Sequence, residues 1–171
     1  HDTDKDDSLR SNQILAAALD FTMPDKTMAK QVVDKVWKQL LTPYGLRTLP
    51  SSDPWYIGKY SGDRRQRDKA YHNGTVWPWL LGPFVTAFLK TKNHEAQWRS
   101  FALDNFLKPL FTEELYRAGL GSISEIFDGD PPHEPNGCVA QAWSVAEPLR
   151  AYIEDALLKR PSFGQKVLGF A

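Results

Sequence analysis

The sequence predicts an all-α fold built from helical hairpins. About five segments have the length and the apolar spacing of helices, and no segment alternates apolar and polar residues as a half-buried strand does. The loops between these segments are alternately short and long. Such hairpins are typical of helical barrels and toroids, whose functional loops gather at one end.

The first two predicted helices cover residues 12–21 and 26–41. The first is short and rich in alanine. In the second, Val33, Val36 and Leu40 recur at helical spacing, while lysines lie off this stripe. We expect it to end before Pro43, because a proline disfavours the helical conformation of the preceding residue.

A long irregular stretch follows over residues 44–73, rich in Gly, Pro, Ser, Asp and Arg. Loops of this length are uncommon inside a compact domain and are usually functional or disordered. Trp55, Tyr56 and Tyr60 argue against disorder, because disordered segments are poor in aromatic residues.

Three further helices are predicted over residues 77–92, 95–117 and 138–158. The first of these is strongly apolar. Pro78 is tolerated in its first turn, whereas Pro83 is a candidate position for a kink.

Composition is that of an ordinary globular domain. A chain of 171 residues with 42% hydrophobic and 25% charged residues can bury a sizeable core. Basic and acidic residues balance at 21 each, so neither nucleic acid nor an anionic membrane is indicated as a partner. No apolar run approaches the ~20 residues of a membrane span. Cys138 is the single cysteine, which favours a reducing, cytoplasmic compartment.

The most informative motif is LGSISEIFDGD at residues 120–130, which AQAWSVAE follows at residues 140–147. It places Glu125 on a loop flanked by glycines, which permit backbone shapes that hold an acid at a fixed position. A carboxylate beside tryptophans is typical of sugar hydrolysis. The sugar ring stacks on the indole while the acid moves a proton or activates water.

This motif and AYHNGTVWPW at residues 70–79 resemble the C-terminal portion of bacterial-type glycogen debranching enzymes, the amylo-α-1,6-glucosidase family. Two shorter tracts fit the same family, DSLRSNQ at residues 7–13 and LTPYGLRTL at residues 41–49. The similarity extends from about Asp7 to Tyr152. The tract at residues 7–13 departs from the family pattern, which usually has proline at the position of Ser11.

The resemblance implies that residues 1–171 form about half of an (α/α)6 barrel, since about five helices do not close a twelve-helix ring. It implies hydrolysis of α-1,6-glucosidic linkages in glycogen-like glucans with inversion, and Glu125 as the general base. Inversion needs a second carboxyl group ~6.5–9.5 Å away as the general acid. In the family this acid is an aspartate that would fall before His1. We therefore expect a missing N-terminal part of the same polypeptide to be this chain's partner, and the chain alone to be inactive.

Residues around the apolar helix are candidates for sugar binding. His72 and Asn73 precede this helix; from sequence alone His72 suits a capping or core histidine, whereas the resemblance favours hydrogen bonds to sugar hydroxyls. Trp77 and Trp79 lie two residues apart and face different ways on a helix. One of them suits sugar stacking and the other suits the core.

Other candidates have strong structural alternatives. Asn12 suits an N-cap, so only the resemblance places Arg10 and Asn12 at the sugar site. Asp68 could bind sugar, but an ion pair with a neighbouring arginine is the simpler interpretation.

The acids and the helix that follow Glu125 complete the candidate set. Asp128 and Asp130 are interpreted as loop-shaping or sugar-binding acids, because neighbours on a short loop would not straddle a sugar that faces Glu125. Gln141 could hold Glu125 or a sugar hydroxyl in place, whereas Trp143 suits the core better than the site.

No cofactor or metal is expected, because the histidines lack metal-ligand spacing and no phosphate-binding glycine loop occurs. Two alternatives for the function stay open. One is a different (α/α)6 α-glucosidase, glucoamylase-like or trehalase-like. The other is a non-catalytic helical module that binds a glucan or a protein, since helical toroids host unrelated functions. A partial barrel would also expose apolar helix faces, so we expect the chain to associate.

Overall fold

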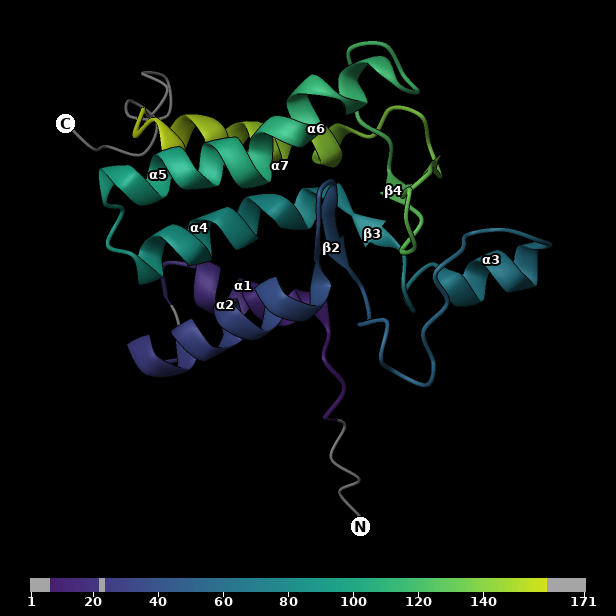
Figure 1. Cartoon of the computed structure of the whole chain (residues 1–171), viewed down its shortest axis with the longest axis horizontal. Coiled ribbons are helices and arrows are strands. Elements are labelled where there is room, and N and C mark those ends of the chain that lie inside the picture. Colours follow the sequence, from purple (N-terminus) through teal and green to yellow (C-terminus); the bar gives the residue numbers. More distant parts are fainter. Residues whose placement is uncertain (1–6, 22–23, 160–171) are drawn as a thin grey trace.

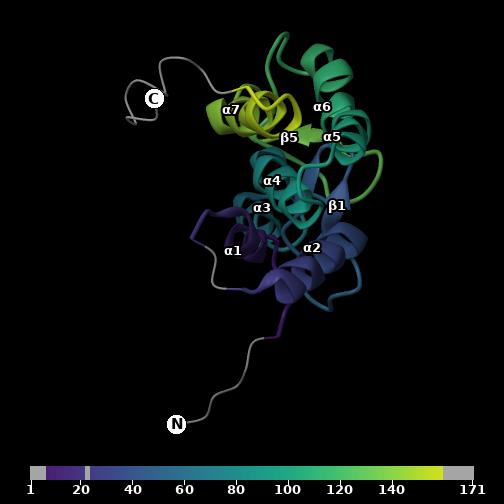
Figure 2. The ribbon, with the colours of Figure 1, turned by 90° about the vertical axis from the view of Figure 1, so that its left-hand side faces the viewer.

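The computed structural model describes residues 7–21 and 24–159, and its helices pack around one central helix, α4 (Leu81–Thr91). On one side of α4 lie α1 (Ile14–Ala18) and α2 (Lys26–Leu40); on the other lie α5 (Ala96–Ala102) and α7 (Ala142–Arg150) (Figure 1). The view at right angles shows α1 and α7 towards one face of the molecule and α2 and α5 towards the other (Figure 2). The predicted all-α class is therefore confirmed in its helical packing, without a closed barrel among the described residues.

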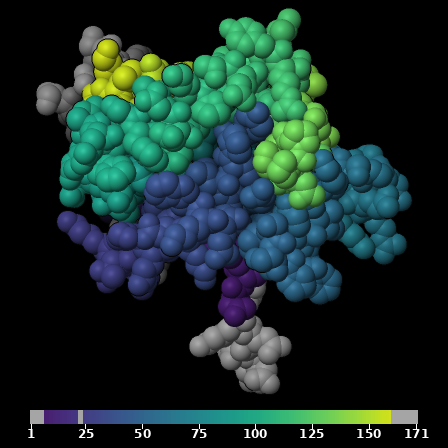
Figure 3. Space-filling model, in the orientation of Figure 1, coloured from purple at the N-terminus to yellow at the C-terminus, as the bar shows by residue number. Residues whose placement is uncertain are grey.

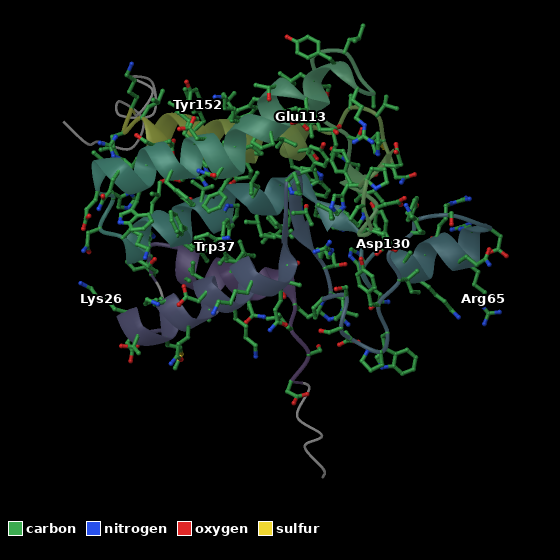
Figure 4. The ribbon with its side chains drawn as sticks, viewed as in Figure 1. Lys26, Trp37, Arg65, Glu113, Asp130 and Tyr152 are labelled. Carbon is green, nitrogen blue, oxygen red and sulfur yellow. The ribbon has the colours of Figure 1, made fainter. Side chains whose placement is uncertain are left out.

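The amphipathic pattern explains α2 and α4. The side chain of Asp25 caps α2 by accepting a hydrogen bond from the backbone N–H of Met28 at 2.8 Å. The predicted apolar stripe of α2 is buried, and α4 is buried on most of its surface because helices pack against it on two opposite sides. Trp37 lies between α2 and α4 (Figure 4), with its ring 5.5 Å from that of Phe88.

Prolines shift the predicted helix boundaries. Residues Pro78–Leu80 form a 3-10 turn, so α4 begins at Leu81 and Pro83 falls in its first turn, where a proline is tolerated.

The helix predicted over residues 95–117 is divided into α5, a π-helical turn (Leu103–Leu107), α6 (Lys108–Thr112) and a 3-10 turn (Glu114–Tyr116). Pro109 has no backbone N–H to donate to a carbonyl in the preceding turn. The helix adopts the wider π-helical turn just before this proline.

The helix predicted over residues 138–158 begins later, at Ala142, contains Pro148 and continues as a π-helical segment (Ala151–Ala156). None of the described helices is long and apolar enough to cross a membrane.

A small antiparallel sheet contradicts the prediction that the chain lacks strands. Its strands run in chain order and have the following bounds: β1 (Leu41–Thr42), β2 (Gly45–Arg47), β3 (Val76–Trp77), β4 (Ile126–Phe127) and β5 (Pro135–Asn136). Leu46 pairs with Trp77, and Val76 pairs with Phe127. Each strand has two or three residues, too few to show an alternating pattern in the sequence. The sheet gathers three distant loops at one end of the helices (Figure 1).

The irregular stretch contains a helix that the sequence pattern did not predict, α3 (Arg64–Ala70). It projects from the molecule, with Arg65 on the part farthest from the sheet (Figure 4). The stretch is held at both sides: the backbone N–H of Ile57 donates to the carbonyl of Asn73 at 2.6 Å, and that of Tyr60 donates to Oδ1 of Asp128 at 2.8 Å. We call residues 50–73, which include α3, the arm. In the space-filling view the arm lies against the loop that follows β4 (Figure 3).

Candidate active site

Glu125 lies directly before β4, and both of its carboxylate oxygens accept hydrogen bonds. The hydroxyl of Tyr71 donates to Oε1 at 2.6 Å, and the backbone N–H of Cys138 donates to Oε2 at 3.1 Å. The backbone N–H of Glu125 donates in turn to the carbonyl of Cys138 at 2.9 Å. Gly137, with φ of 71°, is required here, because a Cβ at this position would lie 2.5 Å from Oε2. The carboxylate is thus held between the segment at Cys138 and Tyr71.

These contacts keep the carboxylate ionised. Burial would raise the pKa of Glu125, but hydrogen bonds from Tyr71, from the backbone and side chain of Cys138 and from the side chain of Gln141 outweigh it, so the pKa is lowered. Burial and the hydrogen bond to Glu125 raise the pKa of Tyr71, which therefore stays protonated as a donor. The side-chain oxygen of Gln141 accepts from the backbone N–H of Ala142 at 3.0 Å, and the predicted role of Gln141 in holding Glu125 stays a prediction.

A series of aromatic side chains in contact with one another begins at Tyr71. The ring of Trp77 lies 4.9 Å from that of Tyr71 and stacks on His72, with 5.5 Å between centroids and 11° between planes. Trp143 contacts both Trp77 at 5.9 Å and Trp79 at 6.2 Å. These five rings form an aromatic cluster that joins Glu125 to a neighbouring hollow.

That hollow, here called the aromatic hollow, has a volume of about 570 Å³. Its lining includes most of the residues that the sequence predicted for sugar binding: Arg10, Asn12, His72, Asn73, Trp77, Trp79 and Trp143. A hollow of this size with apolar walls and a few polar groups suits a small ligand such as a sugar unit.

Arg10 connects the N-terminal turn to the turn at residues 71–74. Its guanidinium donates to the carbonyl of His72 at 2.7 Å and to Oδ1 of Asn73 at 3.2 Å. Asn12 lies inside the 3-10 turn Ser11–Gln13 and makes no cap hydrogen bond, so the capping alternative is wrong for this residue.

Two expectations for tryptophans are resolved by their exposure. Trp143 is 45% exposed, so the expectation that it packs in the core is wrong. Of the pair Trp77 and Trp79, Trp77 is the one that packs in the core: it is 6% exposed, and its indole N–H donates to the carbonyl of Tyr71 at 3.1 Å. Trp79 is half-buried. Trp143 therefore offers a larger free indole surface than Trp77, although both side chains line the aromatic hollow.

None of the predicted acids lines the aromatic hollow, Glu125 included, and Gln141 does not line it either. The other three acids each have a partner elsewhere in this chain. Asp68 is exposed on α3 and pairs with Arg64 at 3.7 Å, as the simpler interpretation held. Asp128 is buried and accepts from Lys59 Nζ at 3.1 Å and from Asn136 Nδ2 at 3.0 Å, besides Tyr60. Asp130 accepts from the Tyr56 hydroxyl at 3.0 Å, close to β4 (Figure 4).

The sequence did not single out Tyr71 or Cys138 as members of the site. Tyr71 is 54 residues from Glu125, so spacing carries no signal for the contact. Cys138 contributes its backbone N–H, a group that every residue type except proline possesses. Tyr71 does lie inside the motif at residues 70–79, which is the signal that could have directed attention to it.

A helical scaffold that holds an ionised carboxylate beside a tryptophan-lined hollow has the arrangement of a carbohydrate-active protein of the glycoside hydrolase class. Comparison with known protein families identifies this one more closely: the chain matches the family described as Amylo-alpha-1,6-glucosidase over residues 1–150. The chain therefore belongs to this family and is related to the glycogen debranching enzymes.

Proposed function

We propose that this chain is the C-terminal part of the catalytic domain of a glycogen debranching enzyme, which hydrolyses α-1,6-glucosidic linkages with inversion. Glu125 is the general base in this proposal. The observation that carries it is the carboxylate of Glu125, which accepts hydrogen bonds from Tyr71 and Cys138. The Tyr71 ring in turn contacts Trp77, a residue that lines the aromatic hollow. Membership of the family supports the reaction type and a glucan substrate.

In the proposed reaction, Glu125 takes a proton from a water molecule, which attacks the anomeric carbon on the face opposite the leaving oxygen. The glucose unit occupies the aromatic hollow, where Trp143 offers a stacking surface and Arg10, His72 and Asn73 offer polar groups. The proton for the leaving oxygen comes from a carboxyl group supplied by the missing N-terminal part. Asp128 and Asp130 are poor alternatives, because neighbours of Glu125 on one short loop would not lie on the opposite side of a sugar that faces Glu125. Their carboxylates accept from Lys59 and Tyr56, away from the aromatic hollow.

The proposed location is the cytoplasm. Cys138 is exposed and unpaired, a state that a reducing compartment maintains.

The test is glucose release from a limit dextrin trimmed to single α-1,6-glucosyl stubs. In the natural full-length protein, Glu125→Gln should lower kcat by about 10²- to 10⁴-fold. Glu134→Gln is a matched control, since Glu134 follows β4 but pairs with Arg117 at 3.0 Å. Full activity of Glu125→Gln would overturn the proposal.

The chain of residues 1–171 is assayed beside the full-length protein and should release no glucose. Glucose release that disappears in Glu125→Gln would show that the general acid lies within these residues. A glucan that binds to the chain and to the full-length protein without any hydrolysis would instead favour the binding-module alternative.

A further inference from the structure

The Tyr71 side chain is fixed on several sides before it reaches Glu125. Tyr71 follows α3, and its backbone N–H donates to the carbonyl of Arg67 at 3.0 Å. Its ring contacts Trp77 and His72, each at 4.9 Å between centroids, and Tyr60 at 5.8 Å. A phenol with so many neighbours has little rotational freedom, so its hydroxyl is presented to Glu125 from one direction.

The same turn forms part of the wall of the aromatic hollow. His72 and Asn73 line the hollow and accept hydrogen bonds from Arg10, which lines it as well. The carbonyl of Tyr71 accepts from the hydroxyl of Thr75 at 2.7 Å in addition to the indole of Trp77. One short turn therefore carries both the groups that would touch a ligand and the hydroxyl that holds Glu125.

We infer that Tyr71 is a positioning residue for Glu125: its hydroxyl fixes the orientation of the carboxylate relative to a sugar in the aromatic hollow. This inference rests on the proposed role of Glu125 as the general base. Neither Tyr71 nor Glu125 is among the residues that line the hollow. The Tyr71 ring contacts two residues of its wall, His72 and Trp77, while the hydroxyl donates to Glu125. Tyr71 therefore acts on the reaction through Glu125. Loss of the hydroxyl should lower the rate of the chemical step and leave sugar binding nearly unchanged.

The first experiment measures the contact in the chain of residues 1–171 without any assay of activity. Glutamate side chains are labelled with ¹³C, the Glu125 signal is assigned by its loss in Glu125→Gln, and the carboxyl is titrated by NMR. In Tyr71→Phe the pKa measured for Glu125 should rise, because a hydrogen bond to the charged form is lost. Tyr60→Phe is the matched control, since the Tyr60 ring contacts Tyr71 and makes no described hydrogen bond to Glu125. Equal titration curves for wild type and Tyr71→Phe would overturn the inference.

The second experiment uses the natural full-length protein. Tyr71→Phe should lower kcat about tenfold with KM within about twofold of wild type, and it should move the acidic limb of the pH profile to higher pH. Near-UV circular dichroism of the tryptophans should be retained. A variant that only loses stability, or that raises KM alone, would mean a merely structural role and would contradict the inference.

The two proposals fail in different ways. If Glu125→Gln keeps full activity, the assignment of the base is wrong, and the positioning role of Tyr71 falls with it. If Glu125→Gln is inactive while Tyr71→Phe has normal kcat and a normal pH profile, only the inference about Tyr71 is wrong.

Discussion

Exposure distinguishes two tryptophans that line the aromatic hollow. Trp143 is 45% exposed, whereas Trp77 is 6% exposed and makes a hydrogen bond within the protein. A sugar ring can stack only on an indole face that it can reach. The sequence predicted that one of Trp77 and Trp79 would stack and the other would pack, but not which, and it placed Trp143 in the core. Spacing along the chain does not report how distant elements pack.

Substitution of each tryptophan should therefore have a different consequence. Trp143→Ala should weaken the binding of a malto-oligosaccharide, measured by calorimetric titration, and change the free energy of unfolding by less than about 1 kcal/mol. Trp77→Ala should lower the free energy of unfolding by about 3–5 kcal/mol, measured with urea, because a buried indole is lost. Equal losses of stability in the two variants would contradict this division.

The lowered pKa of Glu125 predicts a dependence of stability on pH. A carboxyl group whose pKa is lower in the folded than in the unfolded state stabilises the protein above the unfolded pKa, and this stabilisation is lost as the pH falls through the folded pKa. Glu125→Gln should therefore lose more stability relative to wild type at pH 7 than at a pH well below the ordinary Glu value of 4.5. Urea unfolding at both pH values measures the difference. A gap that widens on acidification would contradict the lowered pKa.

At the scale of elements, the sequence predicts the bounds of a helix best where an apolar stripe of that helix packs against the core. The prediction for α2 differs from the structure by one residue at its end, because its apolar stripe and N-cap are local features. It fails for α3, a helix of charged and polar residues without an apolar stripe. The signal there was the capping box, in which Asp63 and Gln66 cap each other's backbone N–H. The sheet was missed for a different reason: its strands have only two or three residues, and the pairings of β2 with β3 and of β3 with β4 join residues that are distant in sequence.

Asp128 links the arm to strand β5, and this structural role can be tested separately from sugar binding. Its carboxylate accepts from Lys59 and Tyr60 on the arm and from Asn136 on β5. Asp128→Asn should speed amide hydrogen exchange at Tyr60 and lower the free energy of unfolding by about 1–3 kcal/mol, because a buried acceptor is replaced. Lys59→Met removes only the half-exposed cation and should lower it by less than about 1 kcal/mol. Weaker glucan binding with unchanged exchange at Tyr60 would instead support the sugar-binding interpretation of Asp128.

For the whole molecule, the face shared by α1, α4 and α7 is concave and charged. A hollow of about 960 Å³ lies between these helices. Lys90 donates to the carbonyls of Ala18 and Leu19 at the end of α1, and Arg150 on α7 pairs with Glu147 and Asp155, each at 3.1 Å. These contacts satisfy the carbonyl groups at the end of α1 and the carboxylates beside Arg150. They also link α1 to α4 and fix the side chains that line the hollow.

Apolar side chains at the edge of this face predict self-association of the chain. Leu19 and Leu158 line the hollow and remain 61% and 55% exposed, and apolar surface of this kind drives association. Analytical ultracentrifugation of the chain should show concentration-dependent oligomers, and the double variant Leu19→Lys, Leu158→Lys should shift the distribution towards monomer. Leu120→Lys is the control, because Leu120 is 84% exposed but does not line this hollow. If all three proteins sediment as monomers, exposure of this face does not drive association, and its apolar edge is tolerated in water as scattered apolar residues are.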